Sequence, residues 1–215
     1  MSKYKNKYRI ESTRLKNWDY GSNGSYFVTI CTKNMEHYFG DIVPIFPIVP
    51  IVEMQNFASL QSEQLYQHHY TQIGQITFDY WKEIPNHFPF VILDEFVIMP
   101  NHIHGIITIN KKNYKKWEPN KFGPQSQNLG SIIRGFKSAV KKYSTLNKID
   151  FQWQPRFYDT LIRDENHLYN VRQYIIKNPM KWIDKENKKK LNQLTVVQSI
   201  LLIFAPIAFN LSSIL

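Results

Sequence analysis

Two runs of strand-forming residues, separated by only two residues, are the feature of this 215-residue chain that most constrains its fold. The run VILDEFVIM covers residues 91–99 and HIHGIITIN covers residues 102–110, and both are rich in β-branched or aromatic residues. Pro100 and Asn101 stand between them, and so short a connection joins antiparallel rather than parallel strands. The segment therefore predicts a β-hairpin whose second strand begins at His102.

Five further segments show the periodicity of regular structure. They are a strand at 25–33, a helix at 71–84 that ends at Pro85, a helix at 128–143, a short edge strand at 151–162 and a helix at 165–178 that Pro179 stops. With the hairpin included, the order is strand, helix, hairpin, helix, edge strand, helix. This order predicts the α+β class, with a single antiparallel sheet and helices packed on it.

The segment GDIVPIFPIVP, residues 40–50, contains three closely spaced prolines. Proline cannot donate a hydrogen bond inside a ladder or a helix, so we expect a loop or an excursion at a sheet edge. It opens an insertion of about residues 40–70, which is either a recognition loop, a dimerisation loop or a segment without function. We expect one domain over residues 1–190, with this insertion inside it, because the chain is too short for two sizeable cores.

The charge of the chain is concentrated in its second half. The formal net charge is +10, yet residues 1–110 carry 8 Lys and Arg against 10 Asp and Glu. Residues 111–190 carry 19 Lys and Arg against 7 Asp and Glu. Such an excess of positive charge indicates a polyanionic partner, and nucleic acid and an anionic membrane both satisfy it.

The ends of the chain and its one cysteine bear on where the protein works. The single Cys31 excludes a disulfide framework and a CxxC metal site. No apolar run follows the basic start MSKYKNKYRI, so the sequence predicts no secretory signal and a cytoplasmic protein. Residues 191–215 carry no charge, and the part from 194 onward is about as long as a membrane span. Polar residues dilute it, so we expect an apolar extension covered by packing or by a partner, with a tail anchor as the alternative.

His102 and His104 are one residue apart on the second strand of the predicted hairpin. Side chains alternate between the two faces of a strand, so both imidazoles lie on one face and Ile103 lies on the other. Two adjacent neutral imidazoles can bind a divalent metal ion. The strand carries no charged residue up to Asn110, which keeps open the alternative that the two histidines are a surface or core coincidence.

Tyr174 and Asn178 are four residues apart on the last predicted helix and therefore share a face. A phenol can act as a nucleophile, and an amide oxygen can complete a metal site. The chain has 13 tyrosines, most of which belong to the core or its rim. Helix phase alone therefore does not single out Tyr174.

Four blocks of sequence, taken together, resemble the single-tyrosine HUH (His-hydrophobe-His) transposases, in the branch of the REP-associated tyrosine transposases. The blocks are LDEFVIMPNHIHGIIT, LGSIIRGFKSAV, WQPRFYDTLIRDE and VRQYIIKNPMKW, and the match covers most of residues 25–183. The resemblance implies the ferredoxin-like antiparallel sheet of the HUH endonuclease fold. It places the two histidines on a central strand and the tyrosine on a C-terminal helix.

The same resemblance implies a role for each motif residue. His102 and His104 match the metal-binding pair, Tyr174 matches the nucleophile, and Asn178 takes the third-ligand position, where related insertion-sequence enzymes have Gln. The implied activity is that of an endonuclease and transposase dependent on Mg²⁺ or Mn²⁺, which cleaves and rejoins single-stranded, hairpin-bearing DNA through a 5′-phosphotyrosine link. A non-catalytic protein that binds structured DNA and derives from a transposase is the alternative. Monomer and homodimer both remain open.

Basic side chains near these motifs are candidates for contact with the DNA backbone. They follow helical spacing on the segment 128–143, flank the tyrosine turn, or belong to the WQPRFYD block. The candidates are Arg134, Lys137, Lys141, Arg156, Lys177 and Lys181. A solvated surface is the alternative for each of them. The aromatic residues of the WQPRFYD block either stack on unpaired bases or close the core, and we expect Trp153 in the core.

Overall fold

The structure is a computed structural model that describes residues 18–45, 66–112 and 127–211, with side chains described up to Asn192. It divides into two compact units. The first unit comprises Met1–Asp41 and His68–Ile176, and the second comprises Ile42–Gln67 and Lys177–Leu215. The two histidines and Tyr174 all belong to the first unit, so the geometry of the candidate site is defined within it.

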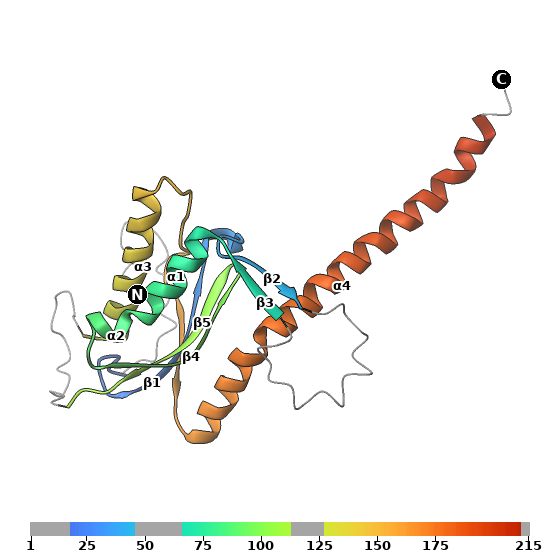
Figure 1. The fold of residues 1–215 in the computed structure, drawn as a ribbon. Coiled ribbons are helices and arrows are strands. Elements are labelled where there is room, and N and C mark those ends of the chain that lie inside the picture. The colour runs from blue at the N-terminus through green and yellow to red at the C-terminus, as the bar shows by residue number, and fades with distance from the viewer. Residues whose placement is uncertain (1–17, 46–65, 113–126, 212–215) are drawn as a thin grey trace, which may run out of the picture. The chain divides into compact units, whose positions relative to one another are not determined.

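A four-stranded antiparallel sheet is the centre of the first unit (Figure 1). Its strands lie in the order β4-β5-β1-β6, and their bounds are β1 Gly24–Cys31, β4 Val91–Met99, β5 His102–Ile109 and β6 Tyr158–Ile162. Helix α1 (Gln72–Lys82) connects β1 to the β4–β5 hairpin, and helix α3 (Leu129–Leu146) connects the hairpin to β6. This βαββαβ succession with β1 and β5 in the centre is the ferredoxin-like topology. The predicted α+β class and ferredoxin-like sheet are confirmed.

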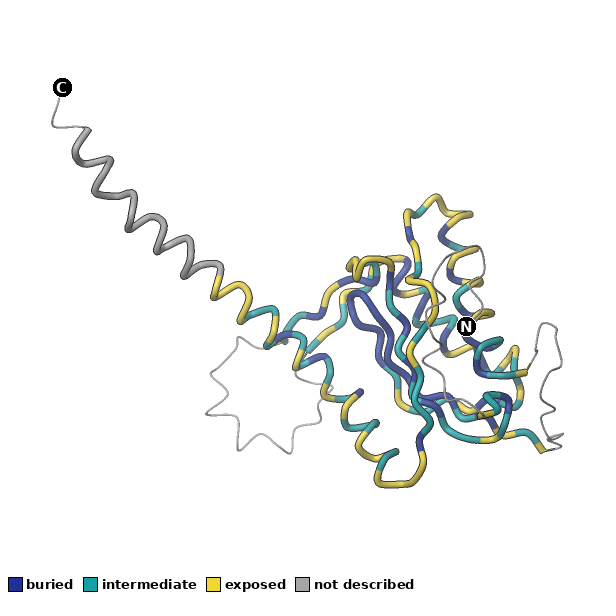
Figure 2. The backbone as a smooth tube through the Cα atoms, turned by 180° about the vertical axis from the view of Figure 1, so that it is seen from behind, coloured by how far each residue is buried: buried dark blue, intermediate teal, exposed yellow. Residues whose placement is uncertain are grey.

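Alternation along β1 explains which face of the sheet became the core. Tyr26, Val28 and Ile30 are all 0% exposed, whereas the residues between them are only partly buried. The buried side chains pack against α1 and α3, which lie side by side on that face (Figure 1). Figure 2 shows the same pattern, with buried residues concentrated in the strands and on the inner sides of these helices. The alternate residues of β1 lie on the other face of the sheet, which α1 and α3 do not cover.

Local sequence signals fix the ends of both covering helices. Asn128 caps α3, because its side chain accepts a hydrogen bond from the Ser131 amide while the Ser131 hydroxyl accepts one from the Asn128 amide. The Thr71 hydroxyl accepts from the Gly74 amide and caps α1. Pro85 does not simply end the helical region, because it occupies the first turn of a separate short helix, α2 (Ile84–His87).

The last helix, α4, spans Glu165–Leu211. The prediction that Pro179 stops this helix is wrong. A proline removes one main-chain hydrogen bond, and good helix formers such as Met180, Lys181 and Lys185 continue the helix beyond it. In the part of the chain that the structure describes, no helix combines the length and hydropathy needed to cross a membrane. The side chains of the uncharged extension beyond Asn192 lie outside the described residues.

The insertion contains two short strands, β2 (Gly40–Pro44) and β3 (Tyr66–Tyr70), which pair with each other. Of the three prolines, only Pro44 is described, and it is the last residue of an edge strand, where a proline is tolerated. The expected loop or edge excursion over Pro47 and Pro50 lies outside the described residues. Apolar and polar residues do not alternate in the segment YQHHY, so its sequence gives no strand signal and β3 was not predicted. Residues 46–65 of the insertion, residues 1–17 and most of the Lys-rich loop, 113–126, lie outside the described residues.

Candidate active site

Strand β5 brings His102 and His104 to one face of the sheet, as the spacing predicts. They lie opposite Cys31 and Thr29 of β1, and opposite Met99 and Val97 of β4. Their side chains are only 9% and 6% exposed. The hairpin turn at Pro100 starts β5 with His102, and the central position of the strand fixes both imidazoles between two neighbours.

Gly105 follows the pair on the helix-covered face, and a close approach explains why it is glycine. A Cβ atom built there would lie 2.4 Å from Cζ2 of Trp81, which is itself fully buried. Trp81 packs against the rings of Phe96 and Phe136, so it has no room to move away. The HIHG motif thus serves two purposes, since its histidines form the site and its glycine admits the largest core side chain.

The tautomer of neutral His102 follows from its neighbour Asn101. The Asn101 side-chain amide donates to the main-chain oxygen of Met35 over 3.0 Å. Because a carbonyl can only accept, Oδ1 of Asn101 must face the imidazole, and Nδ1 of His102 donates to it over 2.6 Å. In neutral His102 the proton is then on Nδ1, and the unprotonated Nε2 faces His104. A histidine oriented in this way by a hydrogen bond through its other nitrogen is typical of a metal ligand.

His104 is held by the hydroxyl of Thr29, which is 2.9 Å from its Nδ1. Its Nε2 faces Nε2 of His102 at 3.0 Å. A hydroxyl can donate or accept, so Thr29 satisfies either tautomer of His104. Burial first, and then the neighbouring His102, lower the pKa of His104 to about 3. The imidazole is therefore neutral at physiological pH, which is the form that binds metal ions.

Tyr174 reaches the same point from α4. Its hydroxyl is 3.3 Å from Nε2 of His104, and the two rings meet edge to face at a centroid distance of 5.2 Å. Phe27 of β1 supports both rings, because it stacks on His104 at 5.4 Å and meets Tyr174 edge-on at 5.9 Å. The tyrosine remains 41% exposed, so part of its side chain is accessible to a ligand in solvent. The structure thus brings the predicted nucleophile and the predicted histidine pair together.

An ion pair fixes the segment of α4 that carries the tyrosine. Arg172 donates from Nε to Asp94 Oδ1 over 2.8 Å and from Nη2 to Asp94 Oδ2, which makes a two-pronged contact with β4. Asp94 lies at the irregularity between Leu93 and Phe96, where the strand register shifts. The hydrogen bond from Arg172 holds the pKa of Asp94 below its usual value. This contact fixes the position of the Tyr174 segment of α4 relative to the sheet.

The geometry of the histidine pair fits an octahedral divalent ion. Two adjacent ligands at about 2.1 Å from such an ion, at a right angle, are about 3.0 Å apart. The two Nε2 atoms have this separation. Among the residues that the structure describes, no cluster of three or more His, Cys, Asp and Glu forms a metal site. An ion held by His102 and His104 would therefore take its other ligands from amide oxygen, water or phosphate.

The structure assigns contacts to several of the predicted DNA-binding residues. Lys137 donates to the main-chain oxygens of Gln154 and Arg156, and Lys141 donates to that of Phe151. These lysines hold the segment that leads into β6, and a role in DNA binding stays a prediction for them. Arg134 and Arg156 are exposed, as DNA contact requires. Trp153 packs among core aromatic rings, which confirms its expected place.

Asn178, Lys177 and Lys181 lie beyond Ile176, in the second unit. Asn178 follows Tyr174 by one helical turn on α4, as predicted from its spacing. Its role as a third metal ligand stays a prediction, as do the DNA contacts of Lys177 and Lys181.

Sequence reasoning missed four residues that orient the site: Asn101, Thr29, Asp94 and Arg172. Asn101 is next to the histidine motif, so its position in the chain could have indicated it. Thr29 is 75 residues from His104, and only the β1–β5 register brings the two together. Asp94 and Arg172 are likewise 78 residues apart, and nothing in their local sequence predicts their pairing.

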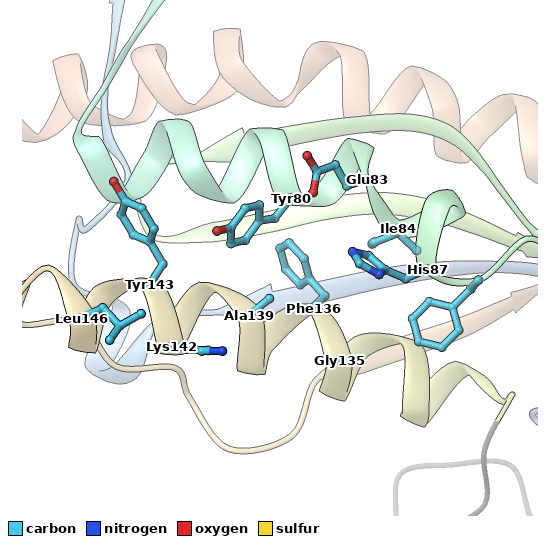
Figure 3. Close-up of a pocket in the computed structure, with 11 residues that line it drawn as sticks. Tyr80, Glu83, Ile84, His87, Gly135, Phe136, Ala139, Lys142, Tyr143 and Leu146 are labelled. Carbon is cyan, nitrogen blue, oxygen red and sulfur yellow. The ribbon is translucent and has the colours of Figure 1, made fainter.

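A pocket lies on the opposite, helix-covered side of the first unit, between α1–α2 and α3 (Figure 3). Aromatic and aliphatic side chains such as Tyr80, Phe136 and Leu146 line it. It contains neither histidine of the pair nor Tyr174. This pocket is therefore separate from the candidate site.

Fold and site together define a class: a ferredoxin-like α+β protein with a histidine pair and a tyrosine on the face of its sheet opposite α1 and α3. Sequence comparison gives two relatives in Haemophilus influenzae. One, named only as an uncharacterized protein, is 37% identical over 182 residues, which cover 80% of this chain and 88% of the relative, so the two belong to one family. The other, named "Putative REP-associated tyrosine transposase", is 31% identical over 103 residues, which cover 47% of this chain and 56% of the relative.

By sequence, about half of the chain is thus similar to a putative REP-associated tyrosine transposase. No protein-family model matches it. A solved REP-associated tyrosine transposase bound to a REP hairpin is similar with a TM-score of 0.48 and 17% identity, covering 80% of this chain and 74% of that one. A putative transposase of Deinococcus radiodurans is similar with a TM-score of 0.32 and 14% identity, covering 78% of this chain and 98% of that one.

Proposed function

We propose that this protein is a metal-dependent transposase that cleaves and rejoins single-stranded, hairpin-bearing DNA through a covalent link to Tyr174. The observation that carries the proposal is the convergence of three groups, in which the Tyr174 hydroxyl lies 3.3 Å from an imidazole nitrogen that is 3.0 Å from the second imidazole. The relation to REP-associated tyrosine transposases supports the same class of reaction. The net positive charge of residues 111–190 suits a polyanionic substrate.

The chemistry assigned to Tyr174 is an in-line displacement at phosphorus. Its oxygen loses the phenolic proton to solvent and forms a bond to the scissile phosphorus, while the bond from phosphorus to the 3′ oxygen breaks and the 3′ oxygen takes up a proton. The product is a 5′-phosphotyrosine and a free 3′-hydroxyl. Because the number of phosphodiester bonds is conserved, a second 3′-hydroxyl can reverse the step and join a new pair of ends without a nucleotide cofactor.

His102 and His104 are the proposed ligands of a divalent ion, Mg²⁺ or Mn²⁺. When bound, such an ion supplies positive charge that stabilises the phosphate oxygens as the bond to phosphorus changes. The protein's own part is to aim both imidazoles, through Asn101 and Thr29, and to keep Tyr174 within reach of the same phosphate. Asn178 is the proposed source of a further oxygen ligand.

A covalent-capture assay tests the proposal. Purified protein is incubated with labelled single-stranded hairpin DNA from the flanks of its own gene and Mg²⁺ or Mn²⁺, and the products are resolved on a denaturing gel. We expect a protein-linked DNA band that is absent from the variant Tyr174→Phe. Tyr169→Ala is the matched control, because Tyr169 is an exposed tyrosine of the same helix outside the site.

DNA that is bound on a native gel but never linked or cut with either ion would contradict the catalytic proposal. That outcome would instead establish the alternative function, a non-catalytic protein that binds structured DNA. A link that persists in Tyr174→Phe would assign the nucleophile to another residue.

A further inference from the structure

One large aromatic side chain beside the candidate site is not explained by packing. Tyr158, the first residue of β6, is 57% exposed. Its neighbours in the same sequence block behave differently, because Trp153 and Phe157 pack partly against the core. The structure thus separates the aromatic residues of this block into two that support the fold and one that faces solvent. A ring exposed to this extent is available to a ligand.

Strand register places Tyr158 in one row with the active-site histidine. Thr29 of β1 is the partner of His104 on one side and of Tyr158 on the other. Side chains of directly opposite residues project to the same face of a sheet. The hydrogen bond between Thr29 and His104 identifies that face as the one that bears the site. Two strand spacings, about 10 Å, separate the backbone of Tyr158 from that of His104.

The ring of Tyr158 is held in place by contacts of its own strand and of the segment before it. The Thr160 hydroxyl donates to the hydroxyl of Tyr158 over 2.9 Å, so the ring is tethered along the strand. Lys137 fixes the preceding segment through the main-chain oxygens of Gln154 and Arg156. A pre-positioned ring loses little conformational freedom when a flat ligand stacks on it.

We propose that Tyr158 is a stacking site for an unpaired nucleobase of the single-stranded DNA, on a nucleotide that flanks the scissile phosphate. The inference extends the proposed function, since it assumes that this phosphate lies at His102, His104 and Tyr174. Single-stranded nucleic acid is bound by aromatic rings that take the bases beside positive charge that follows the backbone. The exposed Arg156, two residues before Tyr158, provides such a charge. Stacking tolerates any base, so this site binds the strand without selecting its sequence.

Binding to two probes in the uncleaving Tyr174→Phe background tests this site. The probes are a fluorescent oligothymidylate and an abasic strand of the same length, measured by fluorescence anisotropy with Mn²⁺ at one fixed salt concentration. Tyr158→Ala is expected to bind oligothymidylate about tenfold more weakly and the abasic strand unchanged. Tyr158→Phe keeps the ring and is expected to bind as the parent does.

Two further variants separate stacking from other effects. Tyr158→Leu keeps an apolar side chain of moderate size without a π face, and it is expected to lose nearly as much affinity as Tyr158→Ala. Tyr169→Ala removes another exposed tyrosine, 62% exposed on α4, and is expected to have no effect. Unfolding curves of all variants, expected to coincide with that of the parent, show whether the fold is retained.

Unchanged affinity for oligothymidylate in both Tyr158→Ala and Tyr158→Leu would overturn the proposal. An equal loss on the abasic strand would also overturn it, because the contact would then be to the backbone. A change in oligomeric state with unchanged affinity per chain would assign Tyr158 to a protein interface instead. If wild type forms no covalent adduct while the Tyr158 effect is present, the proposed function fails together with the placement beside a scissile phosphate, and the stacking of a base on Tyr158 stands.

Discussion

The two faces of the sheet in the first unit are built from the same strands and have different roles. On the face covered by α1 and α3, β1 contributes Tyr26, Val28 and Ile30, which are all fully buried. On the other face β1 contributes Phe27 and Thr29, which are partly open and contact His104. The alternation of a strand therefore lets consecutive residues build a dry core and a polar site.

The difference shows how the protein combines rigidity with chemistry. The packed face contains interlocked rings such as Trp81, Phe136 and Phe96, which hold the strands at fixed spacing. The open face contains polar atoms that are paired with one another, so its few groups are aimed by hydrogen bonds. If this division is correct, substitutions on the open face change mainly activity, and substitutions on the packed face change mainly stability.

The largest expected effect is the loss of activity in His104→Ala. This change removes one proposed metal ligand and a contact of Tyr174, so we expect the covalent DNA product to fall by roughly a thousandfold or more. Mn²⁺ binding, followed by electron paramagnetic resonance, is expected to be lost as well. Thr108→Val is the matched control, since Thr108 lies on the same strand and pairs with Ser25 rather than with the site. Mn²⁺ binding as tight as in wild type would remove His104 from the ligand set.

A smaller effect, on stability alone, is expected for Gly105→Ala on the packed face. The new methyl group would collide with the buried ring of Trp81, so we expect the free energy of unfolding to fall by about 1–3 kcal/mol. Urea denaturation followed by circular dichroism measures this change.

Gly135→Ala in α3 is the control for Gly105→Ala. The nearest atoms, those of the Phe88 ring, are 3.5 Å or more from the added Cβ, so the methyl group has room. We expect this helical substitution to stabilise the protein by about 0.5–1 kcal/mol. Equal effects at the two glycines would contradict the packing argument.

The smallest effect is expected for Asp94→Asn, which weakens the contact between β4 and the tyrosine-bearing segment of α4. We expect the cleavage rate to fall by less than about tenfold, because Tyr174 is then held less firmly beside the histidine pair but keeps its hydroxyl. Single-turnover kinetics measure this change. A Glu95→Gln variant on the same strand is the control and is expected to react at the wild-type rate.

The same ion pair predicts a dependence of stability on pH. The pKa of Asp94 is lowered in the folded protein, so its stabilising contribution is present above the ordinary carboxyl pKa of about 3.9 and is lost as the pH falls through the lower folded value. The difference in stability between wild type and Asp94→Asn should therefore be largest near neutral pH and should shrink on acidification. A difference that grows toward acidic pH would contradict the pairing.

Most of the fold of the first unit was predictable, because its signals are local. The hairpin, the strand after GSNG and the two covering helices follow from periodicity and capping residues, and they appear within a few residues of the expected bounds. The stop at Pro179 was a wrong prediction, since one proline does not outweigh the helix-forming residues around it. Strand β3 was missed because YQHHY has no apolar alternation.

The sequence by itself determined that His102 and His104 share a face, since strand geometry has period two whatever surrounds it. Only the tertiary structure decided which side chains contact those imidazoles. The β1–β5 register brings Thr29 to His104, and the Arg172–Asp94 pair seats Tyr174 above the same nitrogen. Contacts between residues more than seventy positions apart depend on register and helix docking, which are set by the packing of the whole unit rather than by any local pattern.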